Sequence, residues 1–372
     1  AMRHAAVRAN RSPWWAGVGY LNLLTAFAIL IAYTVVAGWV LYYLYLALVG
    51  DFSSIDAGGA NRQFARLLAD VPTLSGWTLV ALGAACLIIY AGVQRGIERA
   101  VSVLMPTLFV LLVGLAIFNV FAGGMAQTLD YLFTPDFSKL SADVFLAAVG
   151  QAFFSIGVAM AGMMMFGAYL PRHVSILHSA VIIVLADTAV ALLAGLVIFP
   201  MVFNNGLDPA GGTGLIFQTL PVAFAQMPGG LFVAVLFFLL LSVAAITSVV
   251  GLCEPLVAWL GERFGLNRHR AVLVLVGLVM LASFCSVLSY NVWQNLSVFG
   301  LTLATLLDWV PNQILLPLGG LFIALFVGWV ALPEHNRDAL NLSHQHFSLW
   351  QGLVRFVVVP AVLIIFVTGV WS

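Results

Sequence analysis

The chain has 372 residues, of which 63% are hydrophobic and only 8% are charged, and its formal net charge is zero. A soluble domain carries about 25% charged residues, so this composition excludes a soluble fold. The balanced charge gives no reason to expect nucleic acid as a partner. No polar linker divides the chain, and we predict one membrane domain over residues 1–372.

Cysteine usage and the first residues exclude two further classes. Cys86, Cys253 and Cys285 each lie in an apolar run and have no C-x-x-C spacing, so neither a disulfide framework nor a zinc site is indicated. The segment 1–11 carries three arginines and no apolar region of the kind found in signal peptides. We therefore expect the membrane spans themselves to direct insertion.

Nine stretches are apolar enough to cross a bilayer as helices, which takes about 20 residues for a hydrocarbon core of about 30 Å. They lack the two-residue alternation of barrel strands. We therefore predict an all-α fold, a polytopic transmembrane helical bundle. In chain order the expected spans are 21–49, 79–94, 102–121, 143–170, 176–203, 230–264, 270–290, 304–330 and 349–371.

The distribution of basic residues predicts the orientation of these spans. If the chain starts in the cytoplasm, ten arginines fall on the inner side and three basic residues, Arg62, Arg66 and Lys139, on the outer side. That asymmetry follows the positive-inside rule. Trp14, Trp15, Tyr20 and Trp350 flank spans, where aromatic residues anchor helices at the membrane interface.

One outer segment, 204–229, has glycines and prolines around two short apolar turns. It can be a re-entrant or capping hairpin over an outer vestibule. It can equally be an ordinary external loop, and the sequence leaves both readings open.

Polar residues of four spans fall near the middle of the bilayer. They are Tyr33, Ser155, Asp187 and the pair Thr247 and Ser248. Polar and charged groups at this depth are costly unless they line a cavity or bind a ligand. Transporters place their substrate and ion sites at this depth.

The centre of 143–170 reads Phe154-Ser155-Ile156-Gly157-Val158-Ala159-Met160-Ala161-Gly162. Two glycines and a serine weaken a helix locally, and an unwound segment would free carbonyl and N–H groups for an ion or a substrate. Close helix packing through small residues is the alternative.

Asp187 is either a buried acid paired with a neighbouring helix or a ligand of a cation. No Lys, Arg or His lies at mid-depth in any span to pair with it. A hard monovalent ion prefers oxygen ligands, which Asp187, Ser155, Thr247 and Ser248 supply. Glu254, two turns below Ser248, is interpreted as a structural hydrogen-bonding group, with a cavity role as the alternative.

Several motifs in one order resemble those of the neurotransmitter:sodium symporter family, whose bacterial members carry amino acids. The quoted strings are Gly96-Ile97-Glu98-Arg99, Met105 to Phe109, Thr134-Pro135-Asp136-Phe137, Ala148 to Gln151 before Phe153 to Ser155, Gly214 to Phe217 with Thr219 to Pro221, and Ala244 to Ser248 with Pro255. Together they cover nearly the whole chain. The resemblance implies a leucine-transporter-type inverted-repeat fold in the inner (plasma) membrane of a bacterium.

The resemblance also implies roles for individual residues. Ser155 and Asp187 resemble ligands of a first sodium site, although many members have Asn at the latter position, so the extra charge could alter ion or proton coupling. Ala244, Thr247 and Ser248 resemble a second sodium site.

The substrate and gating residues follow in the same way. Tyr33 resembles the tyrosine that binds the substrate carboxylate and stacks on the gating aromatic residue, here Phe154. The apolar pocket would be formed by Ile29, Gly157, Met160, Val249 and Leu252, which suggests a hydrophobic amino acid. Asp308 resembles the acid of the outer gate. Sodium ions are the expected ions, and no organic cofactor is expected.

In the family, two helices precede the one that 21–49 resembles, and the first supplies sodium ligands and a gating arginine. Nothing here corresponds to them, so the sequence looks like a transporter cut at its N-terminus.

We therefore expect a sodium-coupled amino-acid importer, with a transport-inactive or regulatory membrane protein as the alternative. An intramembrane protease using Asp187 and Glu254 is a weaker rival, because no H-E-x-x-H motif and no histidine at catalytic depth accompany them. The sequence leaves the identity of the amino acid, the coupling to chloride or protons and the oligomeric state open.

Overall fold

The computed structural model describes residues 2–171, 174–206, 209, 214–298 and 300–371, and nearly all of them are helical. The first half of the chain forms α1 (Met2–Arg8), η1 (Pro13–Trp15), α2 (Ala16–Val49), α3 (Ala57–Ala69), α4 (Val71–Tyr90), η2 (Val93–Glu98), α5 (Arg99–Ala122), α6 (Met125–Phe133), η3 (Phe137–Lys139), α7 (Ala142–Ile156), α8 (Gly162–Ala168) and α9 (Ile176–Asn204).

The second half forms η4 (Leu215–Thr219), α10 (Leu220–Gln226), α11 (Gly230–Phe264), α12 (Arg268–Ser289), β1 (Ser297–Val298), β2 (Leu301–Thr302), α13 (Leu303–Trp309), η5 (Val310–Leu315), α14 (Leu316–Leu325), η6 (Phe326–Val330), α15 (Pro333–Leu340), α16 (His344–Leu353), η7 (Val354–Val358) and α17 (Val359–Trp371). The strands β1 and β2 form a small antiparallel hairpin, with Ser297 opposite Thr302.

Among the described residues, eight helices are long and apolar enough to cross a membrane. The remaining predicted span, 143–170, is present as two shorter helices, α7 and α8. The prediction of about nine spans in an all-α bundle is therefore confirmed. The boundary that differs most is the start of α4, at Val71, eight residues before the expected 79–94, because Asp70 caps a first turn of mixed polarity.

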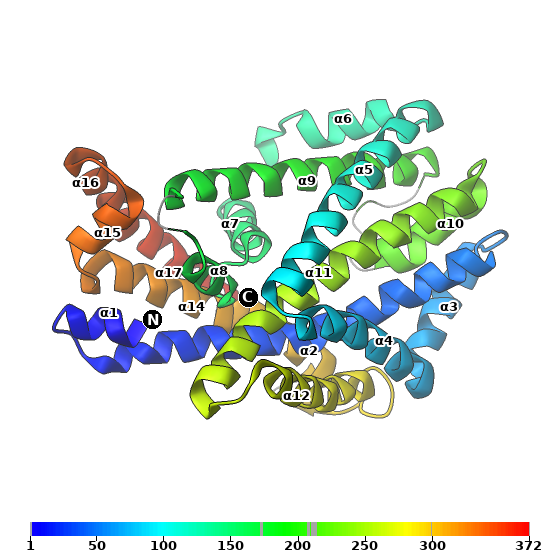
Figure 1. The fold of residues 1–372 in the computed structure, drawn as a ribbon. Coiled ribbons are helices and arrows are strands. Elements are labelled where there is room, and N and C mark those ends of the chain that lie inside the picture. The colour runs from blue at the N-terminus through cyan, green and yellow to red at the C-terminus, as the bar shows by residue number, and fades with distance from the viewer. Residues whose placement is uncertain (1, 172–173, 207–208, 210–213, 299, 372) are drawn as a thin grey trace.

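The two longest helices form the centre of the bundle. α11 packs along α2, and α4, α5 and α12 pack around this pair. Figure 1 shows α1, α15 and α16 gathered at one end of the molecule and α3 and α10 at the other. Asn119 of α5 joins this helix to α9, because its side-chain amide donates to the carbonyls of Leu196 and Val197 at 3.2 and 2.7 Å.

An aromatic cluster fills the core at the α3 and α10 end. Trp39 and Tyr43 of α2 contact Phe217 of η4 at ring-centroid distances of 5.7 and 5.1 Å. Phe64 of α3 stacks on the same ring at 5.4 Å. The described part of 204–229 therefore consists of packed, short helical turns and is not an ordinary loop. That it covers an outer vestibule stays a prediction.

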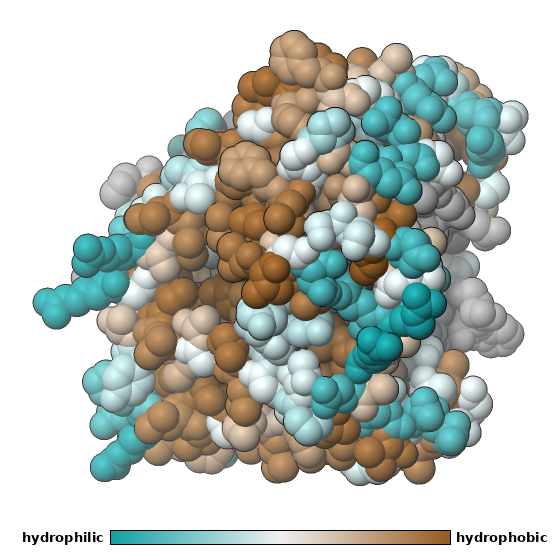
Figure 2. Space-filling model, turned by 90° about the vertical axis from the view of Figure 1, so that its right-hand side faces the viewer, coloured by the Kyte–Doolittle hydropathy of each residue, from teal (hydrophilic) through white to brown (hydrophobic). Residues whose placement is uncertain are grey.

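The outer surface of this end is of mixed character. Figure 2 shows hydrophilic residues gathered along one side of it, beside a broad hydrophobic area. The long helix α9 exposes many of its apolar side chains, and α17 exposes Leu363, Ile364 and Val367.

Candidate functional site: a broken helix beside an acidic pair

The break between α7 and α8 is the centre of the candidate site. α7 ends at Ile156, and Gly157 follows with a φ of +74°. Ala159 and Ala161 also have positive φ, at +66° and +60°. Alanine in this region costs on the order of 1–3 kcal/mol, and such strain concentrates at functional sites. The unwound alternative for this segment is therefore confirmed.

Polar contacts outside the apolar helix fix where α7 begins. Asp136 accepts a hydrogen bond from the Ser138 backbone at 3.1 Å and pairs with Lys139 at 3.2 Å. The hydrogen bond from the Ser138 hydroxyl, helped by Lys139, lowers the pKa of Asp136. Ser141 then caps α7 by accepting from the Val144 N–H at 3.3 Å.

Ser155, in the last turn of α7, lies against Asp187 of α9. Its hydroxyl lies 2.8 and 2.9 Å from the two carboxylate oxygens of Asp187. Among the described residues, no Lys, Arg or His forms an ion pair with Asp187. Because the C-terminal end of a helix carries partial negative charge, both α7 and Asp187 favour a cation at this point. The structure thus brings together the two residues predicted for the first sodium site.

The residues predicted for the second sodium site share one face of α11. Ala244 and Thr247 are half-buried and Ser248 is exposed, whereas Ala245 and Val249 are buried on the other side. The Thr247 hydroxyl donates to the carbonyls of Val243 and Ala244 at 2.9 and 3.0 Å, which leaves its lone pairs free to face a cation. α11 packs against α8, so this face lies beside the broken helix.

Four of the predicted pocket residues gather in one apolar cluster next to the break. Ile29 and Tyr33 of α2, Met160 of the unwound segment and Leu252 of α11 pack around Ala159. Val158, Leu316 and Ile323 complete the cluster. Gly157 lies in the same unwound segment, and the assignment of these residues to a substrate pocket stays a prediction.

Val249, also predicted for the pocket, is fully buried in the core that α11 forms with α2, α4 and α12. Tyr33 and Leu252 pack against both this core and the cluster around Ala159. The assignment of Val249 to the pocket stays a prediction.

Phe154 lies outside this apolar cluster as well. It is 39% exposed and lines a cavity of about 530 Å³ between α7, η5 and α17. In the described part of the chain no ring contact joins it to Tyr33. The structure therefore does not bring these two rings together, and their stacking stays a prediction.

Asp308 lies within α13, is exposed, and accepts a hydrogen bond from the Asn312 side chain at 2.9 Å. The four ion pairs of the described residues do not include it. Its gating role stays a prediction.

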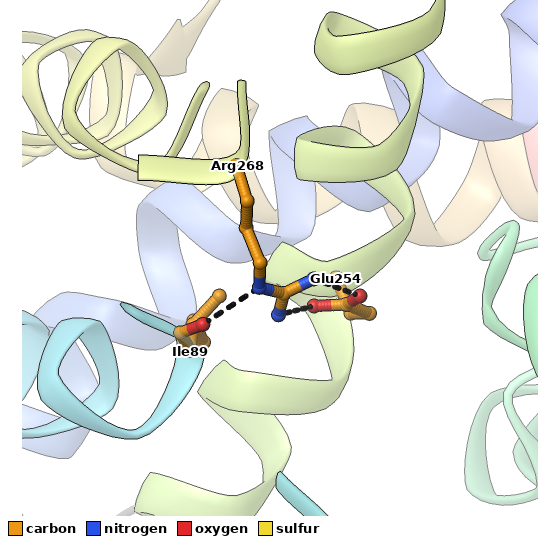
Figure 3. Close-up of polar contacts among 3 residues, drawn as sticks. All are labelled: Ile89, Glu254 and Arg268. Atoms are coloured by element: carbon orange, nitrogen blue, oxygen red, sulfur yellow. Dashed lines mark hydrogen bonds and ion pairs between the residues drawn. The ribbon is translucent and has the colours of Figure 1, made fainter. Parts of the chain in front are cut away.

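Glu254 has a purely structural environment. Its carboxylate is fully buried and accepts two hydrogen bonds from the Arg268 guanidinium, at 2.9 and 2.8 Å. The same guanidinium donates through Nε to the carbonyl of Ile89 at 3.0 Å, in the last turn of α4 (Figure 3). One arginine thus joins α11, α12 and α4, and it is a second donor to the Ile89 carbonyl, which also accepts from the Gly92 N–H at 3.0 Å.

The sequence indicates Arg268 only as a cytoplasmic charge and not as a partner of Glu254. The signal that could have found it is the short turn 265–267, which returns the chain from α11 to α12 and brings Arg268 back toward Glu254. This pairing occupies Glu254 and removes it from the protease hypothesis. No group of three or more His, Cys, Asp or Glu side chains that could hold a metal occurs among the described residues.

Long apolar helices around one broken helix, with an acid and hydroxyls at the break, define the class of helical secondary transporters. Comparison with known proteins agrees. Residues 66–371 match the sodium:neurotransmitter symporter family. The chain therefore belongs to this family, whose fold and activity are those of transporters and not of enzymes.

Two bacterial relatives cover nearly the whole chain. An uncharacterized sodium-dependent transporter of Haemophilus influenzae is 33% identical over 366 residues, which are 97% of this chain and 80% of the relative. The uncharacterized sodium-dependent transporter YhdH of Bacillus subtilis is 33% identical over 363 residues, which are 96% of this chain and 80% of the relative.

A solved structure is similar over the same extent. The crystal structure of MhsT in complex with L-phenylalanine superposes with a TM-score of 0.87 at 36% identity, covering 96% of this chain and 82% of MhsT. The family and the fold expected from the sequence motifs are confirmed.

Proposed function

We propose that this chain is a sodium-coupled symporter that imports amino acids with apolar side chains by alternating access, in the plasma membrane of a bacterium. The observation that carries the proposal is the Ser155–Asp187 pair at the end of α7, directly before the unwound segment 157–161. A cation at this pair would be bound by a full negative charge, a hydroxyl and the carbonyl end of a helix.

The proposed mechanism couples this cation to the broken helix. Sodium bound at Asp187 would favour the conformation in which α7 ends at Ile156, because that conformation presents Ser155 to the carboxylate. A second ion at the Ala244, Thr247 and Ser248 face of α11 would fix α11 relative to α8. The freed backbone groups of 157–161 are then positioned to bind the charged groups of an amino acid.

Two observations support an apolar substrate. The cluster around Ala159 consists of Ile29, Tyr33, Met160 and Leu252 with further aliphatic residues. MhsT, similar over 96% of this chain, was solved in complex with L-phenylalanine. Tyr33 is the residue of this cluster with a hydroxyl group and is the one assigned to the substrate carboxylate.

Uptake of labelled phenylalanine and leucine into proteoliposomes, driven by a sodium gradient, tests the proposal. We expect Asp187→Ala and Ser248→Ala to raise the sodium concentration for half-maximal uptake about tenfold or more, since hydrogen bonds to charged groups contribute about 1.5–3 kcal/mol.

Thr188→Ala and Ser102→Ala are the matched controls. Thr188 follows Asp187 and donates to the Val184 carbonyl, and Ser102 donates to the Arg99 carbonyl. Both should leave uptake unchanged. Sodium-driven uptake that Asp187→Ala and Ser248→Ala do not alter would contradict the assigned ion sites. A chain that folds but transports nothing would favour the inactive or regulatory alternative.

A further inference from the structure

A basic cavity lies at the end of the molecule that carries α1 and α15. It has a volume of about 420 Å³, and its walls come from α1 and from the segment between η6 and α15. His4 and Arg8 of α1 and His335 of α15 line it, and all three are exposed. In the described chain no acidic residue is among its lining residues. The cavity therefore suits an anion.

An apolar groove of about 280 Å³ lies beside this cavity and follows the first turns of α2. Trp14, Trp15, Gly17 and Phe322 are among its walls. The ring of Trp15 packs on Phe326 at a centroid distance of 5.5 Å, and Phe326 lines the basic cavity. The basic cavity and the apolar groove therefore lie on either side of the Trp15–Phe326 pair.

Gly17 faces open space in the groove. A Cβ atom placed there would meet no atom within 4 Å. Trp14, at the mouth of the groove, is 88% exposed. Tryptophan at such a position is typical of the membrane interface, so the groove begins at interface depth and continues along α2 into the apolar region.

Other charges around the cavity preserve its basic character. Arg3 and Arg11 lie on the same N-terminal segment as Arg8. On α15, Asp338 is paired with Arg337 at 3.5 Å, so its charge is compensated, and Glu334 is the remaining acid of that helix. The arginine-rich end of the molecule is also the end that the positive-inside rule places in the cytoplasm.

We propose that the basic cavity and the apolar groove together form one binding site for an anionic phospholipid of the inner leaflet. The headgroup phosphodiester accepts hydrogen bonds from Arg8, His4 and His335, and one acyl chain lies in the groove over Gly17. Basic residues at this depth attract anionic lipids of the cytoplasmic leaflet. A free phosphate ion would use the basic cavity alone, so the groove is the feature that favours a lipid.

Native mass spectrometry of the purified full chain in detergent tests the proposal. Phosphatidylglycerol and phosphatidylcholine with identical acyl chains are titrated separately. We expect phosphatidylglycerol to bind about tenfold more tightly. The double variant R8Q/H335Q should remove most of that preference, because a basic residue near the membrane surface contributes roughly fivefold in affinity. The control is Arg263→Gln, which changes an exposed arginine at the end of α11, on the same side of the membrane.

Gly17→Leu tests the groove separately. The leucine side chain would fill the open space and displace the acyl chain, and leucine favours a helix more than glycine does. We expect weaker phosphatidylglycerol binding with no loss of thermal stability. Gly19→Leu is its matched control, since that position is also open but does not line the groove.

Three results would overturn the site. One is equal affinity for the two lipids, and another is retention of phosphatidylglycerol by both R8Q/H335Q and Gly17→Leu. The third is competition by millimolar inorganic phosphate together with no effect of Gly17→Leu, which would identify a site for free phosphate instead.

Discussion

At the scale of single residues, depth in the membrane was the informative signal. Asp187 and Ser155 are 32 positions apart, yet both fall near the middle of apolar spans, and the structure joins them by hydrogen bonds of 2.8 and 2.9 Å. Membrane burial makes an unpaired carboxylate costly, which is why the sequence could indicate that Asp187 has a special role. The sequence could not indicate which neighbour its oxygens would meet.

For Glu254, too, the sequence could not indicate the partner of the carboxylate. Its apolar surroundings predicted a structural group, and the structure supplies the partner, Arg268. The arginine belongs to the first turn of the next helix, so only the return of the chain through 265–267 places it within reach. The order of residues along the sequence does not give the distance between two side chains on either side of such a turn.

Arg268→Gln should destabilise the protein strongly. The substitution leaves the Glu254 carboxylate buried without its counter-charge, at a cost of about 3–5 kcal/mol, and removes one of the two donors to the Ile89 carbonyl. We expect a markedly lower midpoint of thermal unfolding in detergent. The double variant E254Q/R268Q should recover much of the loss, because it removes both charges together.

Arg337→Gln is the control for this prediction. Its partner Asp338 is 73% exposed, and exposed pairs contribute about 0–1 kcal/mol. The unfolding midpoint should therefore hardly move. If Arg268→Gln were as mild as Arg337→Gln, the ion pair with Glu254 would not hold α11, α12 and α4 together.

At the scale of helices, the break between α7 and α8 was visible in the sequence only in part. Gly157 marks a position where a left-handed conformation is cheap. Ala159 and Ala161 carry no such signal, and their positive φ results from packing. Ala159 is buried against Ile29 and Leu316, so the surrounding helices hold it in a conformation that alanine does not favour.

Gly319 of α14 shows how tightly that packing is made. A Cβ atom there would lie 2.8 Å from the Cβ of Ala159 and 3.0 Å from Oδ1 of Asn22. We expect Gly319→Ala to push α14 away from the unwound segment, to lower the thermal stability by about 1–3 kcal/mol as overpacking does, and to weaken sodium-dependent substrate binding.

The matched control is Gly83→Ala in α4, where a Cβ atom would meet nothing within 4 Å. Alanine favours a helix over glycine by about 1 kcal/mol, so this variant should be as stable as the parent or slightly more so. A Gly319→Ala variant that unfolds at the parent temperature and binds normally would show that the close approach is not needed.

At the scale of the whole molecule, the long apolar helices were predicted well because bilayer thickness sets their length. The short helices were not. α3 buries Ala60, Phe64 and Leu67, a spacing of four and three that indicates an amphipathic helix. Its residues are too polar on average for a search for apolar spans to find it. The aromatic cluster around Phe217 explains why this helix and η4 are ordered: each contributes a ring to it.

The candidate site, too, could be predicted from the sequence only in part. Residues whose polarity was unusual for their depth were found from the sequence, and Ser155, Asp187, Thr247 and Ser248 all lie on faces that the core leaves open or half-open. The apolar pocket residues stay predictions. Val249 is buried in the core, and Leu252, three positions on, packs against both that core and the cluster around Ala159, a difference that the sequence does not show.

We propose that sodium binds at the Ser155–Asp187 pair beside the broken helix and that this ion enables the amino acid to bind. The most direct measurement is equilibrium binding of labelled L-phenylalanine to the purified chain as sodium is titrated against potassium, with Asp187→Ala and Thr188→Ala in parallel. We predict saturable binding that requires sodium, that needs about tenfold or more sodium in Asp187→Ala because the carboxylate is lost, and that is unchanged in Thr188→Ala. Binding that is equal in sodium and potassium, or that Asp187→Ala leaves intact, would contradict the account.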